Sequence, residues 1–524
     1  MVRLKNGASV RALVACAVAT VSLGGVSAAL AESSLSTRTA QMSRADIEST
    51  ISRDVQRRVD GMRRIEGQGK HVSVAATLNT KGDVLTLNLS IEFLPKWYGA
   101  EFEDLLHELA TAAEDQLRDR SSVRAVKFLV GGRDIYDYFP AERPAARPSA
   151  PSSQAPGAAT VVLGAGHGIY YHYKFKDWRA QRDPSNGITE DFITPSFTTE
   201  LSTWLAARSS ATTVFARSQA TTQHAPSKQE WWKLGARYYL EETYPDNPEI
   251  WNSRPDDTSA LRERNEDINS RPLFANFIGA NTLIHIHTNA GDPSATGVRA
   301  FYHTGRSADQ TLADNMLCYM GELIHAKEGY EEYTVPKNSS PRDNLGENSK
   351  ANMPSVIIEA GFHTNASDAA ALQNPVFRTA AMKGVEKGYR LTGEGKPCEL
   401  FKVNKIENST GLQGVPIPVK VPYKGYPEFA VTATVEITSC PSGWTCTGGS
   451  VTYSEKTPSP LKYTFTCNVT SPMPAATFGL RTTLKDIDDV KTKPADHTVT
   501  CTPANQKVVP GAPGAKPTFS ISAS

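Results

Sequence analysis

Apolar residues recur every three or four positions in two segments near the N-terminus, and this spacing predicts two amphipathic helices. The first helix is expected within 42–65, at Ile47, Ile51, Val55, Val59 and Met62. The second is expected at Phe102, Leu105, Leu106, Leu109 and Leu117. Apolar and polar residues alternate between them over 71–93, which predicts a hairpin, and a further strand is expected at 123–130. We therefore predict that residues 38–139 form a small α+β domain. It has no catalytic cluster of its own, so a docking or scaffold role is expected.

The pattern changes twice along the rest of the chain. Residues 140–159 are rich in Pro, Ala and Ser and are predicted to form a linker. Strand and helix patterns then alternate over 160–397, which predicts an α/β catalytic domain with a mixed sheet flanked by helices. Short strands rich in Thr and Val are expected at 415–422, 429–438, 461–470, 476–484 and 497–502. Their recurrence predicts a β-sandwich over 402–504, followed by a disordered Pro/Gly-rich tail over 505–524.

The first 31 residues have the organisation of a secretory signal peptide. A positive region with Arg3, Lys5 and Arg11 precedes an apolar stretch over 12–26, and Ala29-Leu30-Ala31 is a cleavage site. We therefore expect an exported protein in the periplasm, the cell envelope or the medium. A lipoprotein signal ending at Cys16 and an uncleaved anchor stay open as alternatives. No other run of 18 apolar residues occurs, so no membrane span is expected after cleavage.

Composition and charge narrow the class of protein further. The chain has 524 residues, which is enough for several domains. Its 56 Lys and Arg residues balance 55 Asp and Glu residues, for a formal net charge of +1. A protein that binds nucleic acid usually carries a basic domain or stripe, so no nucleic-acid partner is expected.

Export also changes how the seven cysteines are interpreted. Without Cys16, six remain, and an even number in an oxidising compartment favours disulfides. The sequence alone does not choose among the many pairings that six cysteines allow. We favour the pairs Cys440–Cys446, Cys467–Cys501 and Cys318–Cys398.

Three expected strands of the α/β region end in residues that suit catalysis. His167 follows an apolar strand on the glycine-rich turn 164–168. His285 and His287 lie two residues apart in another apolar strand and so face the same side, and neutral imidazole is a common metal ligand. Glu359 ends the apolar run 354–358, where a buried carboxylate is costly unless it is paired or catalytic. Because sites in open α/β sheets form at the carboxyl ends of strands, we expect His167, His287 and Glu359 to converge.

These segments resemble the zinc-dependent N-acetylmuramoyl-L-alanine amidases, the amidase-3 family of cell-wall hydrolases. Five motifs of that family occur here in order. They are Gly164-Ala165-Gly166-His167-Gly168 for D-P-G-H-G-G, Glu190 for a glutamate that opens a helix, Arg271 with Ala275-Asn276 for R-x3-A-N, His285-Ile286-His287-Thr288-Asn289-Ala290 for S-I-H-x-N-A, and Glu359-Ala360-Gly361-Phe362-His363-Thr364-Asn365 for E-x-G-F-x-[ST]-N. The resemblance covers about 161–393.

The resemblance implies one Zn²⁺ ion held by His167, Glu190 and His287, with water as the fourth ligand. It implies that Glu359 is the general base, which takes a proton from that water and returns it to the leaving amine. The bond implied is the amide between the lactyl group of N-acetylmuramic acid and L-alanine in peptidoglycan. Without the family, the helix macrodipole alone would account for an acidic residue such as Glu190 in a first helical turn.

The chain departs from the family motifs at a few residues. Gly164 replaces the aspartate of the first motif, which we expect to loosen that loop. His285 replaces a small serine, so a role behind the ligands and a role as an alternative ligand both stay open. His363 either touches substrate or lies at the surface, and we favour the surface.

A longer departure is the segment 220–266, which exceeds the family's usual connection and is rich in aromatic residues. These are Trp231, Trp232, Tyr238, Tyr239, Tyr244 and Trp251. Because aromatic faces stack on sugars, the segment is either a lid or glycan-binding wall, or a decorating helix packed on the domain by its aromatics. We hypothesise that it borders the cleft.

The sequence therefore predicts an exported zinc amidase that acts on peptidoglycan. Two alternatives stay open: a zinc peptidase or deacylase that acts on another amide, and a catalytically inactive scaffold that binds the wall. The flanking domains could contact the wall or a protein partner.

Overall fold

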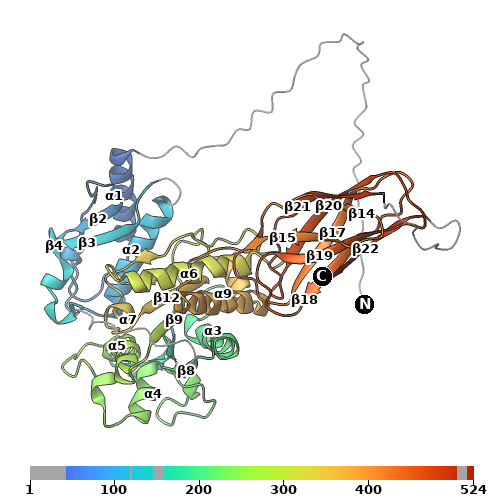
Figure 1. Cartoon of the computed structure of the whole chain (residues 1–524). Helices are drawn as coiled ribbons and strands as arrows, with labels where there is room; N and C mark the ends of the chain where they lie inside the picture. Colours follow the sequence, from blue (N-terminus) through green and yellow to red (C-terminus); the bar gives the residue numbers. More distant parts are fainter. Residues whose placement is uncertain (1–42, 118–120, 145–158, 504–515, 524) are drawn as a thin grey trace, which may run out of the picture. The chain divides into compact units, whose positions relative to one another are not determined.

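The protein is described from a computed structural model, which places residues 43–117, 121–144, 159–503 and 516–523. The expected signal peptide and most of the expected linker lie outside these residues. Residues from 41 onward group into one compact unit (Figure 1). Among the placed residues, no helix combines the length and the apolar character needed to cross a membrane. The predicted domain boundaries stay predictions.

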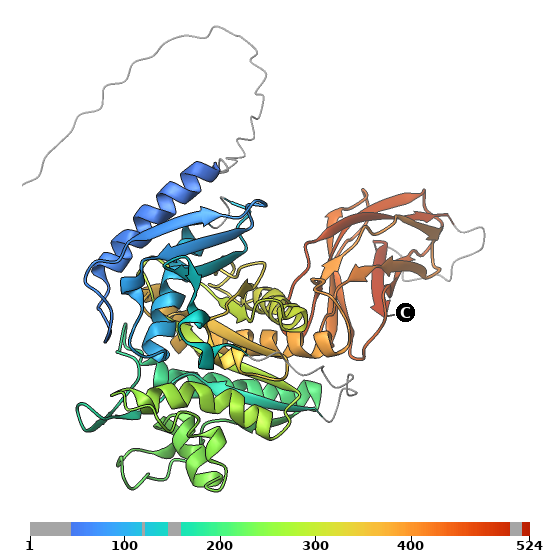
Figure 2. The ribbon, with the colours of Figure 1, turned by 90° about the vertical axis from the view of Figure 1, so that its left-hand side faces the viewer.

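Residues 43–144 form a small sheet with two long helices, as predicted. The elements are α1 (Arg44–Gly61), β1 (Val74–Leu78), β2 (Val84–Leu89), η1 (Ile91–Phe93), α2 (Ala100–Leu117), β3 (Ala125–Val130), β4 (Arg133–Asp134), η2 (Ile135–Asp137) and η3 (Pro140–Glu142). The strand order is β1-β2-β3-β4, with β2 and β3 parallel. The side chain of Ser43 caps α1 by accepting from the Asp46 backbone N–H. The apolar stripe of α1 packs on this sheet, along which the helix runs in Figure 2.

Residues 159–397 form the predicted α/β region. Its strands are β5 (Thr160–Ala165), β6 (Tyr170–His172), β7 (Asp177–Arg179), β8 (Thr212–Phe215), β9 (Thr282–Asn289), β10 (Arg299–Tyr302), β11 (Ser340–Pro341) and β12 (Ser355–Phe362). Its helices are α3 (Glu190–Trp204), η4 (Leu205–Ser209), η5 (Trp231–Lys233), α4 (Ala236–Thr243), η6 (Pro248–Ile250), α5 (Arg262–Phe277), α6 (Ser307–Ile324), α7 (Gly346–Ser349), α8 (Ala366–Gln373) and α9 (Pro375–Gly393). The main sheet has the order β11-β10-β12-β9-β5-β8. It is mixed, because β12, β9, β5 and β8 are parallel whereas β10 runs antiparallel to β12.

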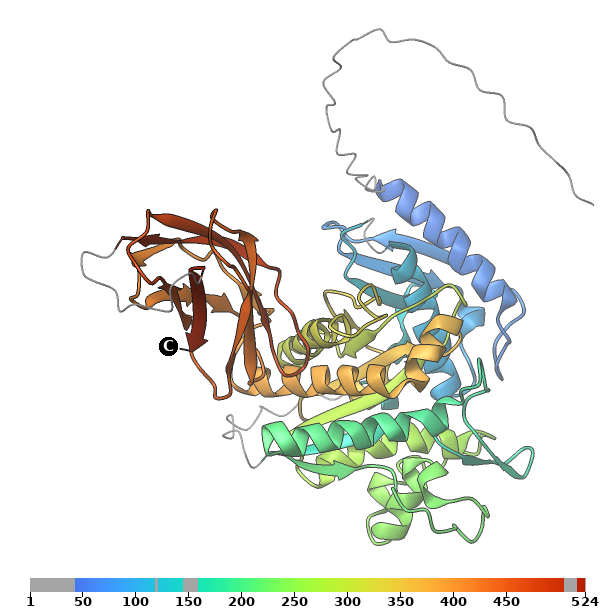
Figure 3. The ribbon, with the colours of Figure 1, turned by 90° about the vertical axis from the view of Figure 1, so that its right-hand side faces the viewer.

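Both faces of this sheet are covered by helices. Val161, Leu163 and Ile284 belong to a core shared with α3, α6 and α9. Figure 3 shows α9, in orange, alongside α6 and α3. Val162 and Leu283, which point to the opposite face, belong to a core shared with α4 and α5. The parallel strands β5, β9 and β12 therefore end at one edge, which positions the site described below.

The C-terminal region is a β-sandwich, as predicted. Its strands are β13 (Lys402–Val403), β14 (Ser409–Leu412), β15 (Ile417–Val421), β16 (Tyr423–Lys424), β17 (Val431–Ser439), β18 (Gly449–Tyr453), β19 (Leu461–Asn468), β20 (Ala476–Lys485), β21 (Ala495–Thr502) and β22 (Thr518–Ala523). A sheet of order β14-β21-β20-β17-β18 and a sheet of order β15-β19-β22 share one apolar core.

The prediction of a disordered tail over 505–524 is wrong for residues 518–523. These residues form β22, which pairs antiparallel with β19. Phe519 and Ile521 alternate with polar residues and pack against the sandwich core, so the segment follows the period of a half-buried strand. The rest of the predicted tail, apart from 516–517, lies outside the described residues.

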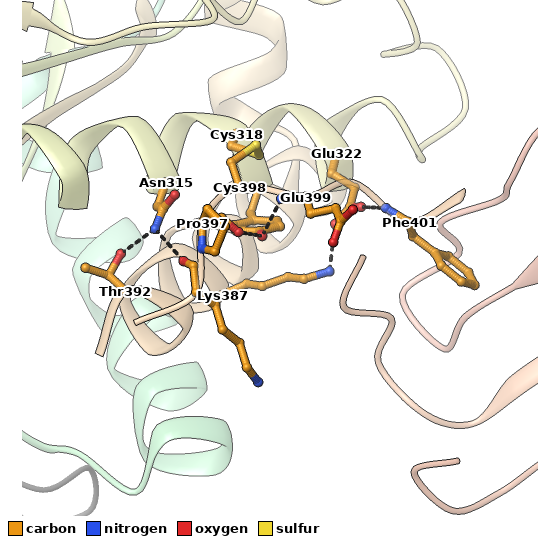
Figure 4. Close-up of a disulfide and its surroundings, with 11 residues drawn as sticks. Asn315, Cys318, Glu322, Lys387, Thr392, Pro397, Cys398, Glu399 and Phe401 are labelled. Carbon is orange, nitrogen blue, oxygen red and sulfur yellow. Dashed lines mark hydrogen bonds and ion pairs between the residues drawn. A yellow bond between two sulfur atoms is a disulfide. The ribbon is translucent and has the colours of Figure 1, made fainter. Parts of the chain in front are cut away.

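The three favoured disulfides are all present: Cys318–Cys398, Cys440–Cys446 and Cys467–Cys501. The first links α6 to the segment that follows α9 (Figure 4). Beside it, Glu322 accepts from Lys387 Nζ and from the Phe401 backbone N–H. The disulfide and these buried contacts fasten the end of the α/β region to the start of the sandwich.

Candidate metal centre and active site

The predicted metal ligands come from the ends of three elements. His167 stands on the turn after β5 with a left-handed backbone, at φ 60°. Glu190 is the first residue of α3, and His287 lies near the end of β9. Gly166 allows the close approach, because a Cβ at that position would lie 2.5 Å from His287 Nδ1.

The side chains of His167, Glu190 and His287 form one buried group, which is called the metal group below. Glu190 Oε1 lies 3.1 Å from His287 Nδ1 and 3.4 Å from His167 Nε2. One potential ligand atom from each residue lies within 4.8 Å of the others. The Thr288 backbone N–H donates to Glu190 Oε1 and fixes the carboxylate. Sequence reasoning thus placed all three residues in one site.

The protonation states of His287 and Glu190 suit a metal ion. Burial lowers the pKa of His287 to about 4, which keeps the imidazole neutral and able to bind a metal. Burial raises the pKa of Glu190, but His167, His287 and Arg182 outweigh it and hold the pKa well below its usual value. Two histidines and a carboxylate are a common ligand set for catalytic zinc. A cation already lies against this face, because Arg182 Nε is 3.1 Å from His167 Nε2 and 3.4 Å from Glu190 Oε2.

A second set of polar residues contacts the other ring nitrogens of His167 and His287. Gln181 Oε1 lies 3.2 Å from His167 Nδ1, and Gln181 Nε2 donates to Asp267 at 2.7 Å. Glu347 Oε2 lies 2.9 Å from His287 Nε2. Arg271 of the R-x3-A-N motif pairs with both Asp267 and Glu347 and joins the two halves. Such outer contacts orient ligand imidazoles and select their tautomers.

Glu359 lies directly beside His287, as the pairing of parallel strands β12 and β9 requires. Its side chain is buried, and its Oε2 has no hydrogen-bond partner among the described residues. Burial and the charge of Glu190 raise its pKa well above the usual value. The expected convergence of His167, His287 and Glu359 is therefore what the structure shows.

Helix α2 covers one side of the site, which the sequence did not predict. Helix α2 contributes Glu103, Asp104 and His107 to a cavity of about 50 Å³. The other side of this cavity is lined by His167, Arg182, Ile268, His287, Leu345, Gly346, Glu347, Ile357 and Glu359. A docking role was expected for the N-terminal region, but the sequence did not indicate that one of its helices faces the metal group.

Comparison with known proteins agrees with this site. Residues 161–389 match the family model of N-acetylmuramoyl-L-alanine amidases. This segment, a little under half of the chain, resembles that family. The matched residues include the three candidate ligands and Glu359. No curated protein matches the chain.

Several solved structures are similar to this chain. Ami1 from Mycobacterium smegmatis is 14% identical, with a TM-score of 0.31, over 46% of this chain and 100% of its own. The catalytic domain of CwlV from Bacillus (Paenibacillus) polymyxa var. colistinus is 17% identical, with a TM-score of 0.29, over 45% and 99%. The CwlD amidase from Clostridioides difficile, solved in complex with the GerS lipoprotein, is 21% identical, with a TM-score of 0.27, over 45% and 98%.

His285 and His363, which lie outside the group of candidate ligands, are both buried. His285 is fully buried with its Nδ1 3.7 Å from Glu347, and burial and Arg271 lower its pKa. The prediction that His363 lies at the surface is wrong, because only 3% of it is exposed. Its backbone N–H donates to Asn289, and its Nδ1 lies 2.9 Å from Thr288 Oγ1. The pairing of β12 with β9 thus draws the ring inward.

The structure favours the second explanation of the aromatic segment 220–266, a decorating element. The rings of Tyr238 and Trp178 lie 4.9 Å apart, and those of Tyr244 and Phe274 lie 5.5 Å apart. Trp251 packs in the core beneath α5. None of the residues that line the cavity at the metal group comes from this segment. The hypothesis that the segment borders the cleft is therefore not supported at this cavity.

Proposed function

We propose that the protein is an exported zinc enzyme that hydrolyses the bond between N-acetylmuramic acid and L-alanine in peptidoglycan. The observation that carries this proposal is the buried group of His167, Glu190 and His287 beside Glu359. The match of residues 161–389 to the family model of N-acetylmuramoyl-L-alanine amidases supports peptidoglycan as the substrate.

In this proposal, His167, Glu190 and His287 would hold the metal, and Arg182 Nε would give up its contact with His167 Nε2. Zinc bound by such a set lowers the pKa of a coordinated water and polarises the substrate carbonyl. Gln181 and Glu347 keep the two imidazoles oriented through their outer nitrogens. The burial of His167, Glu190 and His287 limits their contact with bulk water and strengthens the charge interactions among them.

Glu359 moves the proton in this scheme. Its carboxylate accepts a proton from the attacking water and delivers it to the nitrogen of L-alanine as the C–N bond breaks. The products are a carboxylate on the lactyl group and a free amino group on L-alanine. The buried position of Glu359 beside Glu190 favours a carboxyl group that takes up a proton readily.

Digestion of purified sacculi tests the proposal. The purified chain should contain zinc and should release muropeptides with new N-terminal L-alanine. Glu359→Ala should lose this release while keeping the metal, whereas the exposed control Glu455→Ala should behave like the wild type. New reducing sugar ends would indicate a glycosidase, and cleavage of other amides alone would favour a peptidase or deacylase. A folded, metal-free and inactive chain would favour a wall-binding scaffold.

We also propose that the chain is exported by cleavage of residues 1–31. Three disulfides support an oxidising compartment, such as the periplasm, the envelope or the medium. The mature chain would then consist of an α+β domain over 38–139, a linker over 140–159, the catalytic domain over 160–397 and the sandwich over 402–504. Sequencing the N-terminus of protein isolated from the envelope should yield a chain that begins at Glu32.

A further inference from the structure

The carboxylate of Asp104 lies between two arginines of the catalytic segment. Arg182 Nη1 donates to Asp104 Oδ2 at 2.6 Å, and Arg182 Nη2 donates to Oδ1 at 2.7 Å. Arg264, on α5, also donates to Oδ2. A planar guanidinium binds a carboxylate in this two-pronged way. Burial raises the pKa of Asp104, but the charges of Arg182 and Arg264 outweigh it, so the group is an anion.

This ion cluster lies against the metal group. Arg182 Nε is 3.1 Å from His167 Nε2, and Asp104 and Arg182 both line the cavity that contains Glu359. A cavity of about 50 Å³ has room for a few water molecules at most. This cavity is therefore too small to hold a muramoyl peptide while α2 lies in this position.

Asp104 differs from two other acidic residues by which α2 contacts the catalytic segment, Glu114 and Asp115. Glu114 binds Arg342 through two hydrogen bonds, of 2.6 and 2.8 Å. Asp115 accepts from Arg299 at 2.7 Å. Neither of these two pairs lines the cavity at the metal group, whereas Asp104 does. The attachment of α2 thus has anchors that are separate from the contact at the site.

We propose that Arg182 and Arg264 form a subsite for a carboxylate of the substrate's peptide, and that Asp104 occupies this subsite while α2 covers the metal group. The inference rests on the proposed function, because a peptidoglycan stem carries free carboxylates close to the L-alanine whose amide is cut. Two guanidinium groups beside the metal group recognise such an anion by charge and by geometry. Asp104 is then an internal stand-in for the acidic residue that follows L-alanine.

The subsite predicts that the enzyme distinguishes acidic from neutral peptides. The probes are N-acetylmuramoyl-L-alanyl-D-glutamate with free carboxylates and its diamide. The wild type should have the higher kcat/KM for the free acid. Arg264→Gln should lower the ratio of kcat/KM between free acid and diamide about tenfold, the loss expected for one hydrogen bond to a charged group. Arg264→Lys, which keeps the charge but not the fork, should retain part of the ratio.

Two variants of α2 distinguish the effect of emptying the subsite from the effect of loosening the helix. Asp104→Ala should raise kcat/KM for both substrates and raise it more for the free acid, because the subsite is emptied. Glu114→Gln loosens α2 away from the cavity and should leave the ratio between the substrates at its wild-type value. If Arg264→Gln changes kcat/KM for both substrates equally while its thermal unfolding stays close to the wild type, the arginines only fasten α2 and the proposal is wrong.

A binding experiment separates failure of the subsite from failure of the proposed function. Calorimetric titration of the Asp104→Ala chain with the dipeptide L-alanyl-D-glutamate needs no turnover. Binding that disappears with Arg264→Gln, in a chain that cleaves neither muramoyl peptide, would support the subsite and overturn the proposed function. Cleavage of both substrates at equal kcat/KM, without binding of the dipeptide, would support the function and overturn the subsite.

Discussion

Two departures from the family motifs compensate for each other at the scale of single residues. Gly164 lies opposite His285 in the pairing of β5 with β9. A Cβ at position 164 would lie 2.5 Å from His285 Nδ1. In this chain Gly164 replaces the larger aspartate of the family's first motif, and His285 replaces the smaller serine of its fourth motif. Gly164 makes room for the imidazole, so we no longer expect it to loosen the loop.

A double-mutant cycle tests this exchange. Gly164→Ala should lower the free energy of unfolding by about 1–3 kcal/mol, because the added methyl group overpacks the site. In the His285→Ser background the same change should cost much less. Denaturant unfolding measures both values. Gly393→Ala, where a Cβ meets nothing within 4 Å, is the matched control. Equal losses in both backgrounds would contradict the exchange.

Gln181 gives a second prediction at this scale, since it holds the outer nitrogen of His167. Gln181→Ala should lower the affinity of the chain for zinc by about 10–100-fold, because a ligand whose orientation is lost binds the metal less tightly. Competition with a chelator measures this affinity without any turnover. Gln223→Ala, an exposed glutamine, is the control. An unchanged affinity would mean that the turn after β5 orients His167 without Gln181.

At the scale of elements, α2 combines two faces with different partners. Its apolar stripe, including Phe102, Leu106 and Leu109, packs in the N-terminal core. Its other face presents Glu103, Asp104 and His107 to the cavity of the catalytic region. The spacing of apolar residues predicted the helix and its first face. It could not predict the second, because Arg182 and Arg264 lie 78 and 160 residues away from Asp104 in the chain.

Glu103 makes the docking of α2 sensitive to pH. Burial raises the pKa of this carboxyl group from 4.5 to about 8, against the opposing effects of Gly346, Lys350 and Arg254. A group whose pKa is higher in the folded chain stabilises it below the unfolded pKa, and this contribution is lost as pH rises through the folded pKa.

The melting temperature of the wild type should therefore fall relative to that of Glu103→Gln between pH 5 and pH 8. The expected change is several degrees, at about 2–4 °C for each kcal/mol in a domain of 150–250 residues. Thermal unfolding at both pH values measures it, and Glu108→Gln on the same helix reports the background. A difference between wild type and Glu103→Gln that stays constant with pH would refute the assignment.

The sequence predicted the elements best where a motif or a strict period marked them. His167, His287 and Glu359 were predicted from motifs at strand ends and Glu190 from a motif at the start of a helix, and their roles stay predictions. The second set of polar residues was not predicted, since Gln181 and Glu347 lie in segments without a regular pattern and reach the histidines only after folding. β22 was missed for a related reason: the Pro- and Gly-rich residues before it hide a short alternating run.

At the scale of the whole molecule, the three disulfides close chain segments of very different length. Cys318 and Cys398 are 80 residues apart, whereas Cys440 and Cys446 are 6 apart. In the chain-entropy model, the longer loop gives the larger stabilisation, about 4.5 kcal/mol against about 2.3 kcal/mol.

Replacing each pair of cysteines by alanine tests this difference. The variant without Cys318–Cys398 should lose more unfolding free energy than the variant without Cys440–Cys446. The loss should also extend to the sandwich, because the first disulfide lies where the α/β region meets it. Denaturant unfolding followed by tryptophan fluorescence measures both variants. Equal losses would show that the local packing, and not loop length, decides the effect.

The position of α2 has a consequence for how the enzyme responds to its surroundings. Because α2 and the metal group belong to one chain, closure is unimolecular, and dilution does not weaken it as it would weaken a separate inhibitor. If the proposed subsite exists, groups that compete for Arg182 and Arg264 shift the balance, in addition to the pH dependence of Glu103. The open fraction would then depend on the local density of peptide carboxylates. The chain would stay shut in dilute solution and open where acidic stem peptides are crowded together.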